Sequence, residues 1–136
     1  MSAIQAGVSA ITLFVADVRR SQAFYASLFE REPIYQDAVA ATFRLEGPLL
    51  NLLAVTDAPE LVEPAPVATA ASAAHALLTI TVADCDDACA VLAAKDIHVL
   101  NGPIDRPWGV RTAAFLDPDG HAWELAQPIP PAGGAS

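Results

Sequence analysis

Alternating apolar and polar residues mark two short segments of this chain as β-strands. Residues 11–17 read ITLFVAD, and residues 78–84, which start 67 positions further on, read LTITVAD. Both segments favour β-branched residues, and both end in an aspartate, Asp17 or Asp84, placed to cap a following helix. Two such similar segments half a chain apart predict an internal repeat.

An amphipathic helix is expected after each of these strands. The first is predicted over Val18–Phe29, where Phe24 and Leu28 lie four positions apart on one face. The second is predicted over Cys85–Lys95. Its apolar stripe consists of Cys85, Ala88, Cys89 and Leu92.

Three strand-like runs follow each predicted helix. A turn at Gly47 separates the last two runs of the first half, and the turn Asp117-Pro118-Asp119-Gly120 separates those of the second half. The second turn is a strong hairpin signal, because proline presets φ and glycine accepts a positive φ. The six predicted strands are Pro33–Asp37, Ala41–Leu45, Leu49–Val55, Ile97–Leu100, Arg111–Leu116 and Ala122–Gln127.

Proline-rich segments lie between and after these elements. Thr56–Ala74 is predicted to be a linker or a mobile arm. Asn101–Gly109 is predicted to be a long loop that carries Trp108, and loops with an exposed aromatic side chain often line sites. The tail, Pro128–Ser136, is expected to be frayed.

The order of these elements predicts an α+β fold with two βαβββ modules, at about residues 8–56 and 75–127, a linker at about 57–74 and a flexible tail at 128–136. Each module is too small to bury its sheet alone. We therefore expect both modules to form a single domain over residues 1–136, with a curved mixed sheet, helices on its outer face and a concave cleft for a ligand. The alternative is a packed sandwich without a cleft.

Composition narrows the classes of partner. The net charge of −9 and the absence of a Lys/Arg cluster argue against nucleic acid and against anionic membranes. No apolar run approaches 18 residues, and no secretory pattern is present, so a cytoplasmic protein is expected. Cys85 and Cys89 are interpreted as buried core residues. Only 17% of the residues are charged, which predicts a surface partly covered by a second copy in a homodimer.

Two longer motifs carry a family resemblance. VADVRRSQAFY at residues 15–25 and FLDPDGHAWEL at residues 115–125 resemble the vicinal oxygen chelate superfamily, which includes glyoxalase I, extradiol dioxygenases, and fosfomycin and bleomycin resistance proteins. The stretch PWGVR at residues 107–111 is similar to the bleomycin-resistance-like branch. The resemblance covers about residues 8–127 and implies the two-module fold described above.

The resemblance also implies where a metal would bind, at one residue of the first strand and one of the last strand of each module. These positions fall on Ala10, Asn51, Leu77 and Glu124. Only Glu124 is a good ligand, whereas a divalent site of this type needs several histidines or carboxylates. We therefore expect neither a metal nor another cofactor, unless other side chains are recruited to hold a divalent metal.

Three histidines are the candidates for such recruitment. His75 lies two residues before Leu77 on the same strand face, and a register shift would bring it to the site. His98 begins another strand, and His121 lies in the turn before the last strand. For all three, an exposed or locally hydrogen-bonded histidine is the simpler interpretation.

Strand alternation predicts which residues line the cleft. The resulting surface is apolar with a few hydroxyls, one amide and one carboxylate, and aromatic side chains close it at the edges. That composition suits a flat, mostly hydrophobic ligand. The predicted ligand-binding residues are Thr12, Phe14, Phe43, Asn51, Leu77, Thr79, Trp108, Arg111 and Glu124.

Glu124 has three open interpretations. It contacts a cationic or NH-bearing group of the ligand, it pairs with Arg111 or a backbone amide, or it acts as a catalytic general base. Arg111 starts a predicted strand beside Trp108 and could hold that loop by a charge-assisted hydrogen bond. Strand parity leaves the direction of Arg111 open.

The sequence favours a metal-independent protein that binds a small hydrophobic or aromatic molecule, such as an antibiotic or a metabolite, in the clefts of a homodimer. The main alternative is a metal-dependent lyase, isomerase or dioxygenase that recruits Glu124, His75 and a residue of a partner chain. A metal-free enzyme with Glu124 as base and a structural module with an empty cleft are the remaining hypotheses. The residues do not identify the ligand.

Overall fold

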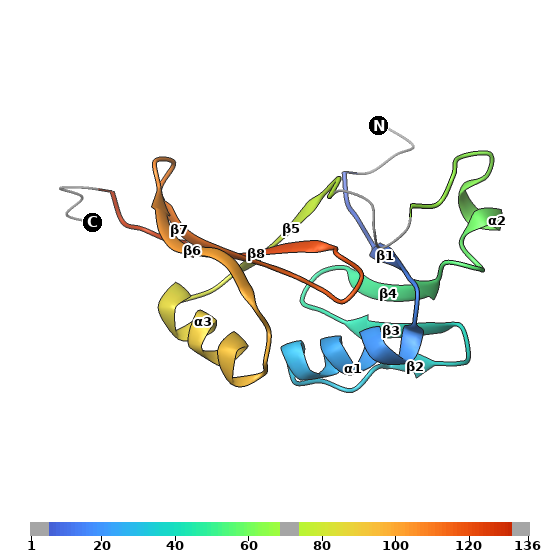
Figure 1. The fold of residues 1–136 in the computed structure, drawn as a ribbon. Coiled ribbons are helices and arrows are strands. Elements are labelled where there is room, and N and C mark those ends of the chain that lie inside the picture. The colour runs from blue at the N-terminus through green and yellow to red at the C-terminus, as the bar shows by residue number, and fades with distance from the viewer. Residues whose placement is uncertain (1–5, 69–73, 132–136) are drawn as a thin grey trace. The chain divides into compact units, whose positions relative to one another are not determined.

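The computed structural model describes residues 6–68 and 74–131 of the chain. The chain divides into two compact units, residues 1–70 and 71–136, and each unit holds one βαβββ module (Figure 1). The repeat in the sequence is therefore a repeat of structure.

The first unit is a four-stranded mixed sheet with one long and one short helix. Its elements are β1 (Ala10–Val15), α1 (Val18–Phe29), β2 (Tyr35–Gln36), β3 (Ala40–Arg44), β4 (Leu49–Ala54) and α2 (Pro59–Val62). The strand order is β1-β4-β3-β2, with β1 parallel to β4 and the other neighbours antiparallel.

The second unit repeats this arrangement. Its elements are β5 (Leu77–Thr81), α3 (Cys85–Ala94), β6 (Val99–Arg106), β7 (Val110–Leu116) and β8 (Ala122–Pro128). The strand order β5-β8-β7-β6 is equivalent to that of the first sheet, and β5 is parallel to β8. The α+β class and the two βαβββ modules with open, curved mixed sheets are confirmed. A cleft shared by both modules stays a prediction.

An aspartate caps each long helix, as its position in the sequence predicts. The carboxylate of Asp17 accepts a hydrogen bond from the backbone N–H of Arg20 at 3.1 Å, and that of Asp84 accepts one from the N–H of Asp87 at 3.0 Å. Each cap satisfies a donor that the first helical turn leaves without a partner, and such a cap contributes about 1 kcal/mol. The same interaction therefore starts the helix in both modules.

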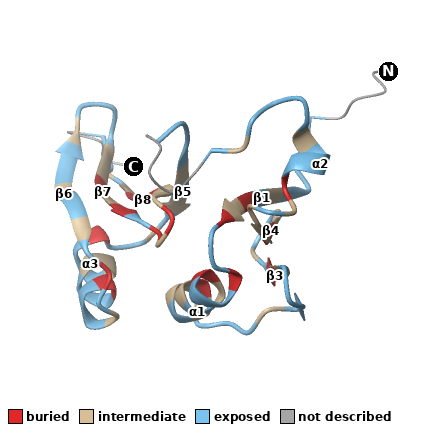
Figure 2. Cartoon of the chain, turned by 45° about the vertical axis from the view of Figure 1, so that its right-hand side comes forward, coloured by how far each residue is buried: buried red, intermediate tan, exposed pale blue. Residues whose placement is uncertain are grey.

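Large aromatic side chains fill the space between each sheet and its helix, and buried positions follow the inner sides of α1 and α3 (Figure 2). In the first unit Tyr25 and Phe43 are fully buried, with their ring centroids 6.5 Å apart. In the second unit the rings of Phe115 and Trp123 stack at 6.4 Å. Each module thus has a core of its own on the helix side of its sheet.

The buried stripe of α1 differs from the expected one. Val18, Ser21 and Tyr25 are buried, whereas Phe24 and Leu28, the expected pair, are only half-buried. Tyr25 rather than Phe24 reaches the sheet, where it packs beside Phe43.

None of the helices in the described part of the chain is long and apolar enough to cross a membrane.

The segment 101–109, predicted to be a loop, forms most of an edge strand and its hairpin turn. β6 extends to Arg106, and only residues 107–109 form the turn. Proline is tolerated in an edge strand because its missing N–H faces away from the ladder. The pairing with β7 shifts register on both sides of Asn101, so Gly102 and Pro103 lie in a β-bulge.

Two further boundaries differ from those expected. The segment 56–74, predicted to be a linker or mobile arm, contains the short helix α2, which has Pro59 in its first turn. Its role as a linker stays a prediction. β8 continues to Pro128, and the N–H of Ile129 donates to the carbonyl of Gly109 at 2.9 Å. The predicted linker also includes residues 69–73, and the predicted frayed tail includes residues 132–136. Both of these ranges lie outside the described residues.

Gly102 is expected to be intolerant of any side chain. It has φ +90°, and a Cβ atom added to it would lie 2.3 Å from the carbonyl oxygen of Thr112. Gly102→Ala should therefore lower the free energy of unfolding by about 3 kcal/mol, measured by chemical denaturation.

Gly47 is the matched control for this substitution. It also has a positive φ, +112°, but nothing lies within 4 Å of an added Cβ. Gly47→Ala should lower the free energy of unfolding by about 1 kcal/mol, the cost of the backbone conformation alone. Equal losses at both glycines would contradict the bulge geometry.

Candidate functional site

Each sheet has a face opposite its long helix, which we call the distal face. Side chains of β1, β4, β5 and β8 alternate between the helix side and the distal face. Those on the helix side are in general the more buried, although Ala126 on the distal face is buried as well. Glu124 lies on the distal face while Trp123 and Leu125 lie on the helix side, as predicted. The distal face of the first unit includes Ala10, Thr12, Phe14, Thr42, Leu49, Asn51 and Leu53, and that of the second unit includes Leu77, Thr79, Thr112, Ala114, Ala122, Glu124 and Ala126.

A row of three polar side chains crosses the distal face of the first unit. Thr12 on β1, Asn51 on β4 and Thr42 on β3 are direct cross-strand neighbours. The hydroxyl of Thr42 donates to Oδ1 of Asn51 at 2.8 Å, and Nδ2 of Asn51 donates to the hydroxyl of Thr12 at 3.2 Å. The amide of Asn51 thus uses both its ends within the sheet.

The equivalent row of the second unit is built differently. Thr79 on β5, Glu124 on β8 and Ala114 on β7 are direct neighbours. The hydroxyl of Thr79 donates to Oε1 of Glu124 at 3.1 Å, and Ala114 offers no donor from the other side. Among the described residues, Oε2 of Glu124 therefore has no hydrogen-bond partner, and this oxygen can receive a donor from a ligand.

A cation that sequence reasoning missed lies on the same distal face. Arg106, the last residue of β6, pairs with Val110, and its Nε donates to the hydroxyl of Thr112 at 3.0 Å. Thr112 and Ala114 are two apart on β7 and share the face that carries Glu124. Arg106 was overlooked because its segment was predicted to be a loop, and a loop residue has no assigned face.

The side chains at the positions implied for a metal do not fit a divalent ion. Ala10 and Leu77 have no donor atoms, and the amide of Asn51 is bonded to two threonines. Glu124 is then the one strong donor among the four positions, whereas such sites need three or four. Across residues 6–68 and 74–131, no group of three or more His, Cys, Asp or Glu side chains could hold a metal ion.

The three candidate histidines are dispersed. His75 and His98 are exposed. His121 is bonded through Nδ1 to the buried carboxylate of Asp117 at 2.7 Å, and this hydrogen bond raises the pKa of His121. The expectation of a locally hydrogen-bonded histidine is confirmed for His121. The same carboxylate accepts the N–H of Asp119 at 2.9 Å, which tightens the predicted turn.

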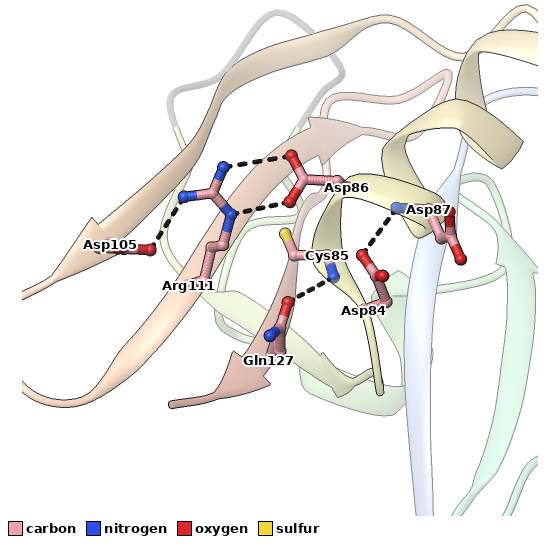
Figure 3. A network of polar contacts seen from close by, with 7 residues as sticks. All are labelled: Asp84, Cys85, Asp86, Asp87, Asp105, Arg111 and Gln127. Carbon is pink, nitrogen blue, oxygen red and sulfur yellow. Dashed lines mark hydrogen bonds and ion pairs between the residues drawn. The ribbon is translucent and has the colours of Figure 1, made fainter. Parts of the chain in front are cut away.

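Arg111 lies on the helix side of its sheet and not on the distal face, which corrects its place among the predicted ligand-binding residues. Its guanidinium binds Asp86 of α3 at 3.0 Å and Asp105 of β6 at 2.9 Å (Figure 3). β7 residues alternate, and Arg111 shares the side of Ala113 and Phe115. Arg111 therefore joins helix to sheet and does not neutralise Glu124.

The structure also corrects the predicted place of Phe43 at a cleft edge, but not that of Trp108. Phe43 is fully buried beside Tyr25 on the helix side, so it cannot close a cleft at its edge. Trp108 is 70% exposed at the tip of the β6–β7 hairpin, two residues beyond Arg106. A role for Trp108 in ligand binding stays a prediction, as it does for Thr12, Phe14 and the other distal-face residues.

The two cysteines are free thiols on α3. Cys85 is buried, and burial raises the pKa of its thiol to about 11. Burial also raises the pKa of Cys89. The backbone N–H of Cys85 donates to the side chain of Gln127 at 2.8 Å, which ties the start of α3 to β8 (Figure 3). Protonated thiols of this kind are poor nucleophiles. The interpretation as a buried core residue is confirmed for Cys85, whereas Cys89 is only half-buried.

A family model described as the Glyoxalase/Bleomycin resistance protein/Dioxygenase superfamily matches residues 7–125. This range spans both modules and includes all residues of the two polar rows.

Solved structures with the same fold share little sequence with this chain. A glyoxalase/bleomycin resistance protein/dioxygenase from Nocardioides is 21% identical, with 94% of this chain and 87% of that chain covered and a TM-score of 0.82. A glyoxalase-related enzyme from Fulvimarina pelagi is 24% identical, with coverage of 90% and 88% and a TM-score of 0.77. A lactoylglutathione lyase from Agrobacterium tumefaciens is 19% identical, with coverage of 91% and 95% and a TM-score of 0.73. At these identities the likeness concerns the fold alone.

The Asp117–His121 pair should make stability depend on pH. The pKa of His121 is raised above its ordinary value of 6.5, so the pair stabilises the fold fully below pH 6.5, and this contribution is lost as pH rises through the raised pKa. The difference in unfolding free energy between the wild type and His121→Gln should therefore shrink from pH 5 to pH 9. His98→Gln controls for removal of an exposed histidine, and a pH-independent difference would contradict the pair.

Arg111→Met should lower the melting temperature in low salt, because Asp86 and Asp105 lose their common partner. Both carboxylates are well exposed, so added salt should reduce the difference from the wild type. Thermal unfolding at two ionic strengths measures this effect. An unchanged melting temperature in low salt would show that the bridge between α3 and the sheet contributes nothing to stability.

Proposed function

The chain belongs to the Glyoxalase/Bleomycin resistance protein/Dioxygenase superfamily, and from this membership we propose that it binds a small, largely apolar or aromatic molecule without a resident metal ion. The proposed contacts lie on the distal faces of the sheets. The ligand is an antibiotic or a metabolite of that chemistry, bound rather than transformed.

The observation that carries this proposal is the surroundings of Glu124. Its neighbours on the distal face are the hydroxyl of Thr79 and three alanines, Ala114, Ala122 and Ala126. Thr79 uses one carboxylate oxygen and leaves the other to a donor from outside the described residues. A single charged acceptor on a floor of small apolar side chains is suited to a ligand with an apolar body and an NH or cationic group.

The donor chemistry supports binding without a metal. A lyase, isomerase or dioxygenase that depends on a metal would need at least two more strong donors beside Glu124, and Ala10, Asn51 and Leu77 do not supply them. The described residues at these four positions therefore supply only one donor, Glu124, to the metal-dependent alternative.

We propose that the protein acts as a cytoplasmic homodimer. The low charged fraction, 17%, supports coverage of part of the surface by a second copy.

Elemental analysis of protein purified without a metal-affinity column tests metal independence. We expect folded protein with a substoichiometric content of transition metals. A stoichiometric metal that is lost in Glu124→Ala would overturn this part of the proposal and favour the metal-dependent enzyme.

Glu124→Gln should weaken binding of a cationic aromatic probe, naphthalen-2-ylmethylamine, about tenfold, because the charged acceptor becomes neutral with little change in shape. Titration calorimetry measures the dissociation constants. Glu46→Gln, which removes the same charge from the exposed turn between β3 and β4, should leave them unchanged. Equal affinities in the wild type and Glu124→Gln would contradict the proposed role of Glu124.

A further inference from the structure

Arg106 is held in place on the distal face of the second unit. Its Nε donates to the hydroxyl of Thr112 at 3.0 Å, and Thr112 is only 1% exposed. This hydrogen bond to a buried partner restricts the rotamers of the Arg106 side chain, so less conformational freedom is lost when a ligand binds.

The other end of this guanidinium is available. In the part of the chain that the structure describes, Nη1 and Nη2 of Arg106 have no hydrogen-bond or ion-pair partner, since the Thr112 contact uses Nε alone. Two N–H groups in a rigid fork match the two oxygens of a carboxylate.

Glu124 and Arg106 do not neutralise each other. Thr79 holds Oε1 of Glu124 on the β5 side of β8, whereas Thr112 holds Arg106 over β7, on the opposite side of β8. Thr112 is paired with Ala126, two residues from Glu124, which places Thr112 and Glu124 about 7–8 Å apart as diagonal neighbours. Within the described residues, no hydrogen bond or ion pair joins the guanidinium of Arg106 to the carboxylate of Glu124.

Small side chains occupy the surface between the two charges. Ala126 is the direct cross-strand partner of Thr112, and Ala114 is that of Glu124. Ala122 adjoins Glu124 on the side away from Thr112. In the first unit, the positions equivalent to Ala122 and Ala126 hold Leu49 and Leu53. Of the two units, as far as the structure describes their residues, the second combines two opposite charges with a floor of alanines.

From this arrangement we infer that Arg106 binds a carboxylate of the ligand while Glu124 receives an NH group of the same molecule. The ligand class is a small amphoteric compound, with an aromatic or apolar body that carries a carboxylate and an NH donor. This inference rests on the proposed function and specifies the ligand of the same site.

Three probes with one aromatic body separate the two charged contacts: naphthalene-2-carboxylate, naphthalene-2-carboxamide and naphthalen-2-ylmethylamine. The wild type should bind the carboxylate about tenfold more tightly than the carboxamide, measured by titration calorimetry at low ionic strength. Arg106→Gln should abolish this preference and leave the affinity for the amine unchanged or higher.

Two further variants keep the result interpretable. Arg20→Gln removes a cation from an exposed position of α1, on the helix side of the other unit, and should preserve the preference for the carboxylate. Arg106→Lys keeps the charge but not the fork, and should retain only part of the preference. Thermal unfolding of each variant verifies that it is folded.

The outcomes distinguish the two proposals. If the amine and the carboxamide bind but the carboxylate binds no better than the carboxamide, the role of Arg106 is wrong and the proposed function stands. A preference that survives Arg106→Gln would also overturn that role. If none of the three probes binds at millimolar concentration, both proposals are overturned for aromatic ligands.

Discussion

In each unit the strand β4 or β8 joins the parallel edge strand to the antiparallel part of the sheet, and its register with both neighbours decides which side chains meet. Shifting either strand by one residue would exchange its buried and distal-face side chains. The buried partners, such as Phe115 beside Trp123, make that exchange costly, so the core holds the polar row on the other face in position. The position of Glu124 beside Thr79 is thus a consequence of packing on the opposite side of the sheet.

Much of this arrangement could be predicted from the sequence, because it depends on local periodicity. The starts of the two long helices follow from the caps at Asp17 and Asp84, and the face of Glu124 follows from simple alternation with Trp123 and Leu125. The internal repeat then placed Asn51 and Glu124 at equivalent positions of the two sheets. Each of these signals is contained in a few consecutive residues, or in a comparison of the chain with itself.

The features that escaped prediction depend on which strands pair and where the pairing is irregular. Because of the bulge at Gly102 and Pro103, most of β6 was predicted to be a loop, so Arg106 could not be assigned to a face of the sheet. Arg111 pairs with Asp86 on α3 and Asp105 on β6, and only the three-dimensional packing brings these residues together. Phe43 was predicted to bind the ligand at a cleft edge, but it lies in the core beside Tyr25, because it faces the helix side while Thr42 faces the distal face.

The two modules also show how one substitution on a central strand reverses the direction of hydrogen bonding across a sheet. With Asn51 at the centre, donation runs from Thr42 through the amide to Thr12, so the hydroxyl proton of Thr12 is left for an acceptor beyond the row. With Glu124 at the centre, the hydroxyl of Thr79 donates its proton to the carboxylate, so only its lone pairs are left to accept a donor beyond the row. Two threonines that the repeat makes equivalent therefore have opposite polarity, one as a donor and the other as an acceptor, at the outer strands of their sheets.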